Sequence, residues 1–347
     1  MMRLPRFAYR APETVHEAVT ILAGEGPSAR VLAGGTDLLP NMKRRQQTPA
    51  TLVSLRRIPA LHRTSHAQGV ALGACTTLAD LVQDRGIRDG HPALWQAAAQ
   101  VATPHLRNTA TLGGNLCLDT RCWYYDQNWE WRRAIDFCMK KDGSTCWVAP
   151  GSPRCLAVSS TDTAPALVAL GAHVRLESAD GTRVVPVAEL FRNDGIEYLA
   201  KRADEILTEV LLEPADGWRS AYWKLRRRGS FDFPVLGVAA AARFASDGRT
   251  VEQARVVLGA VSSMPQTSVD AAELIVGHEL TDARIERAAQ AAGKVAKPMD
   301  NTDFTLHWRK RVAGEMVSWA LRELRGDDVR AARVRYARHD PGAAIEG

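Results

Sequence analysis

The sequence predicts an α+β protein in which a cysteine-rich lobe is inserted. Short apolar strands alternate with amphipathic helices along most of the 347 residues. This alternation stops over residues 118–156, which hold four tryptophans, many charges and few aliphatic side chains. Five of the six cysteines fall between residues 117 and 155. The length allows two or three domains with a core in each, and something other than an aliphatic core is expected to organise the insert.

The first segment, residues 1–57, has a β–α–β pattern. Residues 13–24 have helical spacing of apolar side chains, and residues 29–33 form a short apolar strand that leads into Gly34-Gly35-Thr36-Asp37. A second strand is predicted at 51–55. The glycine pair therefore follows the end of a strand.

The second segment, residues 58–217, contains the cysteine-rich insert. Its other predicted elements are a strand at 69–73, helices at 77–83 and 93–101, a glycine-rich turn at 111–115, a helix at 164–171 and a strand at 173–176. The insert at 118–156 thus separates two stretches of regular structure.

The third segment, residues 221–327, predicts a smaller α+β domain. Its elements are strands at 235–242 and 254–258 and helices at 282–292 and 304–325. The tail, residues 328–347, is rich in Arg and Ala and predicts an exposed helix that frays.

Charge and hydropathy exclude several classes of function. The formal net charge is +6, but acidic and basic residues are interleaved, so a solvated surface is expected and no nucleic-acid partner. No stretch approaches the roughly 20 apolar residues of a membrane span. The first residues contain no apolar signal core. A cytoplasmic protein is therefore expected.

Two glycine pairs are candidates for binding a phosphate group. Glycine permits positive φ and close approach of the backbone, so successive N–H groups can converge on an anion. The first is Gly34-Gly35-Thr36-Asp37 and the second is Gly113-Gly114-Asn115, which has the Thr111 hydroxyl beside it. Neither pair is a Rossmann or Walker fingerprint, and each alone is more typical of a tight turn. Facing each other, the two could clamp a diphosphate.

Four cysteines of the insert are candidate metal ligands. They are Cys122, Cys138, Cys146 and Cys155, separated by 15, 7 and 8 residues. Four thiolates can hold a [4Fe–4S] cluster, a [2Fe–2S] cluster or a zinc ion. None of these gaps is the short knuckle typical of structural zinc, which favours a bulkier cluster. Zinc stays open on spacing alone, and buried free thiols are the other alternative.

Asp162 and Lys224 are the remaining candidates. Asp162 precedes a helix with Pro165 near its start, which is typical of an N-cap, although the carboxylate could also contact a ligand. Lys224 begins a basic run. If that run is a strand, alternate side chains share a face, so Lys224 and Arg226 could both reach inward.

Together these motifs resemble the flavoprotein subunit of the molybdenum hydroxylase (xanthine dehydrogenase) family. The resemblance rests on residues 31–38, 107–116, 162–171 and Lys224, and it extends over about residues 4–325. It implies a two-part FAD-binding domain of the PCMH type, followed by a smaller α+β C-terminal domain. It also implies which residues bind the cofactors. The FAD contacts would be Val31, Leu32, Ala33, Gly34, Gly35, Thr36, Asp37, Leu38, Thr111, Gly114, Asn115, Asp162 and Lys224, and the [4Fe–4S] ligands would be Cys122, Cys138, Cys146 and Cys155.

The insert narrows the resemblance. Most family members lack these roughly forty residues, whereas the Thr120-Arg121-Cys122 start and the cysteine spacing are similar to the β subunit of 4-hydroxybenzoyl-CoA reductase. The flavin subunit of bacterial aldehyde oxidoreductases also has a cysteine-rich insert, with different spacing. The expected function is therefore that of an FAD- and [4Fe–4S]-containing electron-transfer subunit.

The same resemblance implies partners and a reaction. The partners would be a large molybdopterin-binding subunit and a small [2Fe–2S] subunit, in a dimer of heterotrimers. Electrons from ferredoxin or another low-potential donor would pass through [4Fe–4S], FAD and [2Fe–2S] to molybdenum, for reductive dehydroxylation of an aromatic acyl-CoA. Two alternatives remain: a subunit of an oxidising molybdenum hydroxylase or aldehyde oxidoreductase, and a zinc-stabilised binding module without redox activity.

Overall fold

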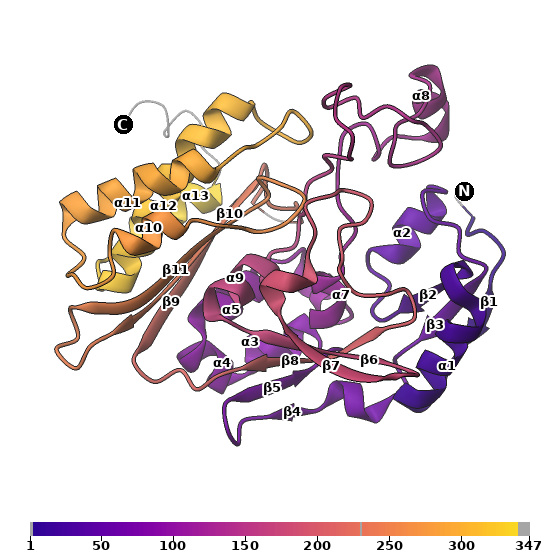
Figure 1. The fold of residues 1–347 in the computed structure, drawn as a ribbon, viewed down its shortest axis with the longest axis horizontal. Coiled ribbons are helices and arrows are strands. Elements are labelled where there is room, and N and C mark those ends of the chain that lie inside the picture. The colour runs from indigo at the N-terminus through magenta and orange to yellow at the C-terminus, as the bar shows by residue number, and fades with distance from the viewer. Residues whose placement is uncertain (1–2, 230, 339–347) are drawn as a thin grey trace.

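Three separate β-sheets organise the computed structural model, which describes residues 3–229 and 231–338 (Figure 1). The sheets have three, five and four strands, in the orders β1-β3-β2, β4-β5-β8-β6-β7 and β12-β11-β10-β9. The first two sheets lie side by side, and the third lies with its helices at the other end of the molecule (Figure 1).

The first sheet confirms the predicted β–α–β pattern. β1 (Ala8–Arg10) and β2 (Ala29–Leu32) both pair in parallel with β3 (Thr51–Ser54). The connections are α1 (Val15–Glu25) and α2 (Leu38–Lys43). Helix α1 buries the side chains of Ala18, Val19 and Leu22, as its apolar spacing predicts. The first glycine loop joins β2 to α2, so it lies beyond the carboxyl end of a parallel strand.

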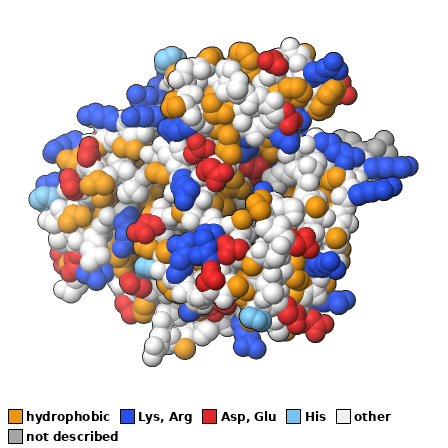
Figure 2. Space-filling view, turned by 45° about the vertical axis from the view of Figure 1, so that its right-hand side comes forward, with side chains coloured by type: hydrophobic (Ala, Val, Ile, Leu, Met, Phe, Trp, Pro, Cys, Tyr) orange, Lys and Arg blue, Asp and Glu red, His pale blue; other side chains and the backbone are white. Residues whose placement is uncertain are grey.

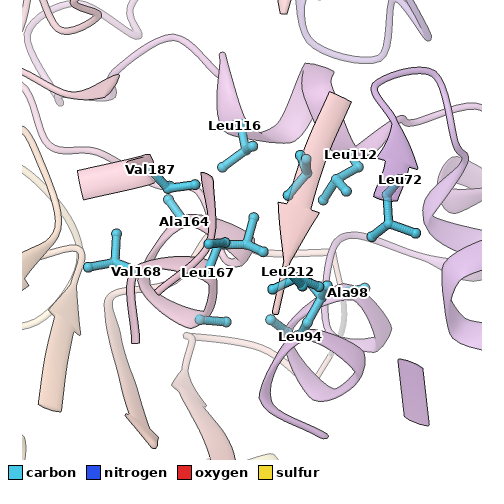
Figure 3. Close-up of a cluster of buried hydrophobic side chains, with 14 of the residues drawn as sticks. Leu72, Leu94, Ala98, Leu112, Leu116, Ala164, Leu167, Val168, Val187 and Leu212 are labelled. Carbon is cyan, nitrogen blue, oxygen red and sulfur yellow. The ribbon is translucent and has the colours of Figure 1, made fainter. Parts of the chain in front are cut away.

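The second sheet is antiparallel and carries helices on one face. Its strands are β4 (Thr64–Ser65), β5 (Val70–Gly73), β6 (His173–Ser178), β7 (Gly181–Pro186) and β8 (Ile206–Leu212). Of these, β4, β7 and β8 were missing from the sequence prediction. The helices of this segment are α3 (Leu78–Gln83), α4 (Arg85–Gly90), α5 (Pro92–Ala99), α6 (Pro104–Arg107), α7 (Leu112–Leu116) and α9 (Thr163–Leu170). Leu72, Leu94, Leu112, Leu167 and Leu212 meet in the core between sheet and helices (Figure 3).

The predicted glycine-rich turn at 111–115 is wrong in detail. Residues Leu112–Leu116 form the short helix α7, and Thr111 is its N-cap, whose hydroxyl accepts a hydrogen bond from the Gly114 N–H. The cap makes a helical turn possible despite two glycines. Short 3-10 turns occur at Gly26–Ser28, Pro59–His62 and Val187–Leu190.

The third sheet lies between two cores. Its strands are β9 (Trp218–Leu225), β10 (Leu236–Phe244), β11 (Val251–Gly259) and β12 (Gln266–Thr267). Side chains alternate along β9: Ala221 and Trp223 face the C-terminal helices, whereas Tyr222 joins the core beneath α9. The C-terminal helices are α10 (Val269–Glu273), α11 (Asp282–Val295), α12 (Leu306–Arg325) and α13 (Arg330–Arg338).

The tail forms a helix as predicted, but this helix is not fully exposed. Helix α13 does form, but Ala332 and Tyr336 are buried, and the Tyr336 ring packs edge-on against Trp223 at 5.7 Å between ring centroids. The apolar spacing of these two side chains is what docks the helix. Residues 339–347 lie outside the described residues.

The insert forms a lobe that projects from the second segment, with α8 (Trp129–Ala134) at its far end (Figure 1). Its small core consists of Cys122, Tyr125, Cys138, Cys155 and Ala157. All four of its tryptophans are substantially exposed. The lobe therefore has a core made chiefly of cysteine and tyrosine. No helix of residues 3–229 and 231–338 is long and apolar enough to cross a membrane.

Candidate functional site

Both glycine loops line one cavity of about 750 Å³. Figure 2 shows a face of the molecule that is hollowed below its uppermost lobe. The volume lies within the usual range of roughly 300–1,000 Å³ for ligand pockets. Twelve of the thirteen candidate FAD contacts line it, namely Val31, Leu32, Ala33, Gly34, Gly35, Thr36, Asp37, Leu38, Thr111, Gly114, Asn115 and Asp162. Lys224 is not among the described residues of its wall.

The first loop approaches the second segment closely because it has no side chain at Gly34. A Cβ on Gly34 would lie 2.1 Å from the carbonyl oxygen of Thr109, which is far inside van der Waals contact. Gly35 adopts φ +73°, in the left-handed region that favours glycine. The loop is therefore pressed against residues 109–110, and the two glycine motifs, which lie about seventy-five residues apart in the sequence, form one cradle.

Two polar side chains of the second loop form hydrogen bonds within the protein. The Thr111 hydroxyl caps α7, as described above. The Asn115 Oδ1 atom accepts hydrogen bonds from the Thr161 hydroxyl at 2.8 Å, and from the Thr163 hydroxyl and N–H at 2.7 and 3.2 Å. Asn115 thus fixes the segment that carries Asp162, and only its Nδ2 group is left to face a ligand.

Asp162 is not a side-chain N-cap, although it precedes α9. Its carboxylate makes no cap hydrogen bond. It accepts instead from Lys224 Nζ at 2.9 Å and from the Tyr222 hydroxyl at 2.8 Å. Lys224 also donates to the backbone carbonyl of Gln100 at 3.0 Å. Lys224 therefore does not line the cavity itself but binds Asp162, which does.

Burial dominates the electrostatics of this pair. Burial raises the pKa of the Asp162 carboxyl, and Lys224 and Tyr222 act against that rise. Burial lowers the pKa of the Lys224 amine, and Asp162 acts against that shift. Each charge is thus tolerated in the interior because of the other. Arg226, the other inward candidate, is half-buried and donates to the Gln100 and Gly229 carbonyls.

Arg121 is a buried contact of the first loop that the sequence analysis did not single out. Its guanidinium forms an ion pair with Asp37, donates to Asn41 Oδ1 at 3.3 Å and lies over the Phe233 ring. Its backbone pairs with Val158 across the base of the lobe. The position next to Cys122 was the available signal, but nothing in the sequence indicates which acid it meets.

The four candidate cysteines converge, although they span 34 positions of the sequence. Cys122, Cys138, Cys146 and Cys155 are all buried, at 5–7% exposure, and line one small cavity of about 10 Å³. Burial raises the pKa of the Cys122 thiol to about 12 and that of Cys155 to about 11. Of the other two cysteines, Cys75 packs in the core between the first sheet and α1, and both Cys75 and Cys117 line the large cavity.

The cysteines are not arranged around a single ion. Within the described residues, no group of three or more His, Cys, Asp or Glu side chains has the geometry of a site for a metal ion. Four sulfur atoms around a zinc ion lie about 3.8 Å apart, as follows from Zn–S bonds of about 2.3 Å. A cluster of four irons separates its ligands more widely. The cysteine donor set fits such a cluster chemically, and the small cavity requires the thiols to spread around it.

Comparison with known proteins decides the family. Residues 5–214 match the family model of the FAD binding domain in molybdopterin dehydrogenase, and residues 220–324 match the CO dehydrogenase flavoprotein C-terminal domain. The chain belongs to the FAD-binding subunits of the molybdenum hydroxylase family. The resemblance inferred from the glycine motifs is therefore confirmed at the level of the family.

Two relatives and one solved structure show how far the likeness extends. The carbon monoxide dehydrogenase medium chain of Hydrogenophaga pseudoflava is 30% identical over 321 residues, covering 91% of this chain and 96% of the relative. The aldehyde oxidoreductase FAD-binding subunit PaoB of Escherichia coli (strain K12) is also 30% identical, over 336 residues, covering 90% and 98%. A structure of the Hydrogenophaga pseudoflava enzyme lacking the Mo-pyranopterin moiety of its cofactor superposes with a TM-score of 0.74 at 28% identity, covering 92% and 97%.

As a member of this family, the chain is an oxidoreductase subunit. Its two-domain organisation, an FAD-binding domain followed by a flavoprotein C-terminal domain, is that of the carbon monoxide dehydrogenase medium chain.

Proposed function

We propose that this subunit binds FAD in the large cavity and a [4Fe–4S] cluster on the four cysteines of the lobe. The observation that carries the proposal is the convergence of four buried thiols in one cavity, in a lobe that rests on the flavin-binding domain. When bound, the two cofactors supply the electron transfer. The chain supplies their binding groups, their spacing and their separation from solvent.

The flavin half of the proposal rests on the cradle. Residues 34–37 line the cavity, and their backbone N–H groups suit the FAD diphosphate. The N–H groups of Leu112, Gly113 and Gly114 at the start of α7 are already bonded within the protein. Gly34 and Gly114 keep this wall free of side chains. Asp162 lies in the same cavity, where its carboxylate can meet a polar edge of the cofactor. Lys224 holds that carboxylate in position.

The partners follow from the family. We propose a large molybdopterin-binding subunit and a small [2Fe–2S] subunit, assembled as a dimer of heterotrimers. The name "medium chain" of the carbon monoxide dehydrogenase relative is in line with a middle-sized subunit of such an enzyme. The substrate would then bind on the large subunit, and this chain would relay electrons.

For the reaction, we propose reductive dehydroxylation of an aromatic acyl-CoA with electrons from ferredoxin or a similar donor, as in 4-hydroxybenzoyl-CoA reductase. The support is the insert, with its Thr120-Arg121-Cys122 start and cysteine spacing. The second candidate is oxidation of an aldehyde or another substrate of molybdenum hydroxylases. It is favoured by the 30% identity to an aldehyde oxidoreductase subunit over nearly its whole length.

The cofactors are tested on the full chain purified without oxygen. We expect one FAD and four irons per chain in the unaltered protein. Cys138→Ala should lose the iron and its broad visible absorption while retaining FAD, and Cys75→Ala, which alters a cysteine outside the lobe, should keep the iron. Full iron content in Cys138→Ala contradicts the ligand assignment. Stoichiometric zinc without iron supports the zinc-stabilised module instead.

The reaction is tested on the complex with its partner subunits. Reduced ferredoxin with 4-hydroxybenzoyl-CoA is compared with an aldehyde and an electron-accepting dye. Turnover only in the second assay replaces the reductive proposal with the oxidising one.

A further inference from the structure

Lys140 lies between two cavities. One is the small cavity lined by the four cysteines of the lobe (the cysteine cavity), and the other is the large cavity lined by the glycine loops (the flavin cavity). The Lys140 side chain lines the cysteine cavity and is only 6% exposed. Nζ donates to Asp119 Oδ1 at 2.8 Å, to the Thr120 hydroxyl at 2.7 Å and to the Gly195 carbonyl at 2.6 Å. All three donor positions of the ammonium are thus used, which fixes the charge at one point.

Asp119, which forms an ion pair with Lys140, lies on the side of the flavin cavity. It lines the large cavity together with Tyr198. Its Oδ2 atom accepts from the Tyr125 hydroxyl at 3.1 Å and from Gln47 Nε2 at 3.0 Å. The carboxylate is therefore held as firmly as the ammonium, with the negative member toward the flavin cavity and the positive member toward the cysteines.

Two tyrosine rings complete the connection. The Lys140 ammonium lies 4.8 Å from the centroid of the Tyr125 ring and 5.6 Å from that of Tyr198. Tyr125 lines the cysteine cavity and Tyr198 the flavin cavity. Lys140 thus contacts the walls of both cavities, and the pair binds the lobe to the flavin-binding domain through Gly195 and Gln47.

We propose that the Lys140–Asp119 pair sets the reduction potentials of the two cofactors. The inference rests on the proposed function, because it requires FAD in one cavity and a cluster in the other. Both residues are positioning residues for electron transfer. They belong to the insert, which begins at residue 118.

The physical reason is the effect of a fixed buried charge on an added electron. A reduced cofactor carries more negative charge than an oxidised one, so a nearby cation raises its reduction potential and a nearby anion lowers it. Weak screening in the protein interior makes a single charge effective over the distance between neighbouring cavities. Removing the ammonium should therefore lower both potentials, and removing the carboxylate charge should raise both.

The test is a spectroelectrochemical titration of the full chain loaded with FAD and with iron and sulfide. Lys140→Met should reduce the equilibrium constant for reduction by about tenfold, which is about 30 mV for the two-electron flavin couple and about 59 mV for a one-electron cluster couple. Asp119→Asn should shift both couples by a similar amount in the opposite direction. Lys140→Arg should stay within about threefold of the unaltered protein.

The matched control is Lys141→Met. Lys141 is the neighbouring lysine, partly exposed and paired with Asp142 at 3.3 Å, and its removal should leave both potentials unchanged. If the pair only fastens the lobe, Lys140→Met and Asp119→Asn will loosen it alike and shift the potentials in one direction or not at all. Either result overturns the inference. If Lys140→Met does not fold, the nearly isosteric Asp119→Asn carries the test, and a shift that is absent or negative overturns it.

Failure of the proposed function gives a different result. Unaltered protein that binds FAD but takes up no iron removes the cluster from the proposal, and the flavin couple then still tests the pair. Unaltered protein that holds both cofactors, combined with variants that do not move the potentials, defeats the inference alone.

Discussion

Lys224 donates a hydrogen bond to Asp162 at 2.9 Å across the boundary between the two domains. Lys224 lies on β9 of the C-terminal domain, and Asp162 precedes α9 of the FAD-binding domain. The two side chains are 0% and 3% exposed. A polar wall of the proposed flavin site thus depends on how the two domains are joined.

Removing one member of this pair should be costly. Lys224→Met leaves the Asp162 carboxylate buried without its counter-charge, so we expect a loss of about 3–5 kcal/mol in the free energy of unfolding. The double variant Lys224→Met/Asp162→Asn should recover much of that loss. Arg227→Met, which removes an exposed cation paired with Asp303, should cost less than about 1 kcal/mol. Urea denaturation measures all three. Equal losses of unfolding free energy in Lys224→Met and Arg227→Met contradict the prediction.

Gly34→Ala should abolish tight FAD binding. The new Cβ meets the Thr109 carbonyl oxygen at 2.1 Å, so the two loops must separate and the cradle widens. We expect FAD affinity to fall by at least about a hundredfold, a change of about 2.7 kcal/mol. Gly24→Ala is the matched control, because its Cβ meets nothing within 4 Å and the site lies within helix α1. This control should bind FAD normally and gain about 0.5–1 kcal/mol in stability. Fluorescence titration with FAD reads out the affinity.

Arg121→Met should weaken FAD binding without removing the cradle. The guanidinium neutralises Asp37, which lines the cavity, and an unpaired carboxylate there repels the cofactor diphosphate. We expect a loss of about tenfold in affinity, with Arg121→Lys restoring part of it. Arg133→Met, which changes an exposed arginine of the same lobe, is the control and should bind FAD normally. An Arg121→Met variant of unchanged affinity shows that the ion pair does not serve the flavin site.

Glu205 should make part of the stability depend on pH. Burial would raise the pKa of its carboxyl, but Arg183, with bonds of 2.7 and 2.9 Å, and the Arg202 N–H hold that pKa below its usual range. A carboxyl with a lowered folded-state pKa contributes stability above its unfolded pKa of about 4.3, and this contribution is lost as the pH falls through the lower folded value. Glu205→Gln should cost about 1–2 kcal/mol at pH 7 and flatten the pH dependence below about pH 4.5. Denaturation curves between pH 3 and pH 7 measure both. Parallel curves for variant and unaltered protein contradict the prediction.

Local patterns in the sequence predicted about half of the helices and strands. Helix α1 and strand β2 lie within two residues of their predicted bounds, because apolar spacing follows the geometry of each element. Some of the missed elements depend on contacts between residues distant in the sequence. Strand β8 was missed, and it exists because β5 and β6 pair with it on either side. The turn at 111–115 is helical because Thr111 caps it.

The candidate site shows the same division. The glycine loops and the cysteines could be found from residue type and spacing, and the structure brings each set to one cavity. Arg121, Lys140 and Asp119 could not be assigned a role in this way. Their roles depend on contacts with residues that are distant in the sequence, such as Asp37 and Gly195.

By itself, the sequence determined the family of this protein, its two glycine loops and the presence of a cysteine-rich insert. These are properties of local chemistry: glycine where backbone must approach a ligand, and thiols where a metal centre is expected. Only the tertiary structure decided that Asp162 binds Lys224 rather than capping its own helix, and that Lys140 lies between the two cavities. The physical reason is that a buried charge must find its counter-charge in space, and folding selects that partner from the whole chain.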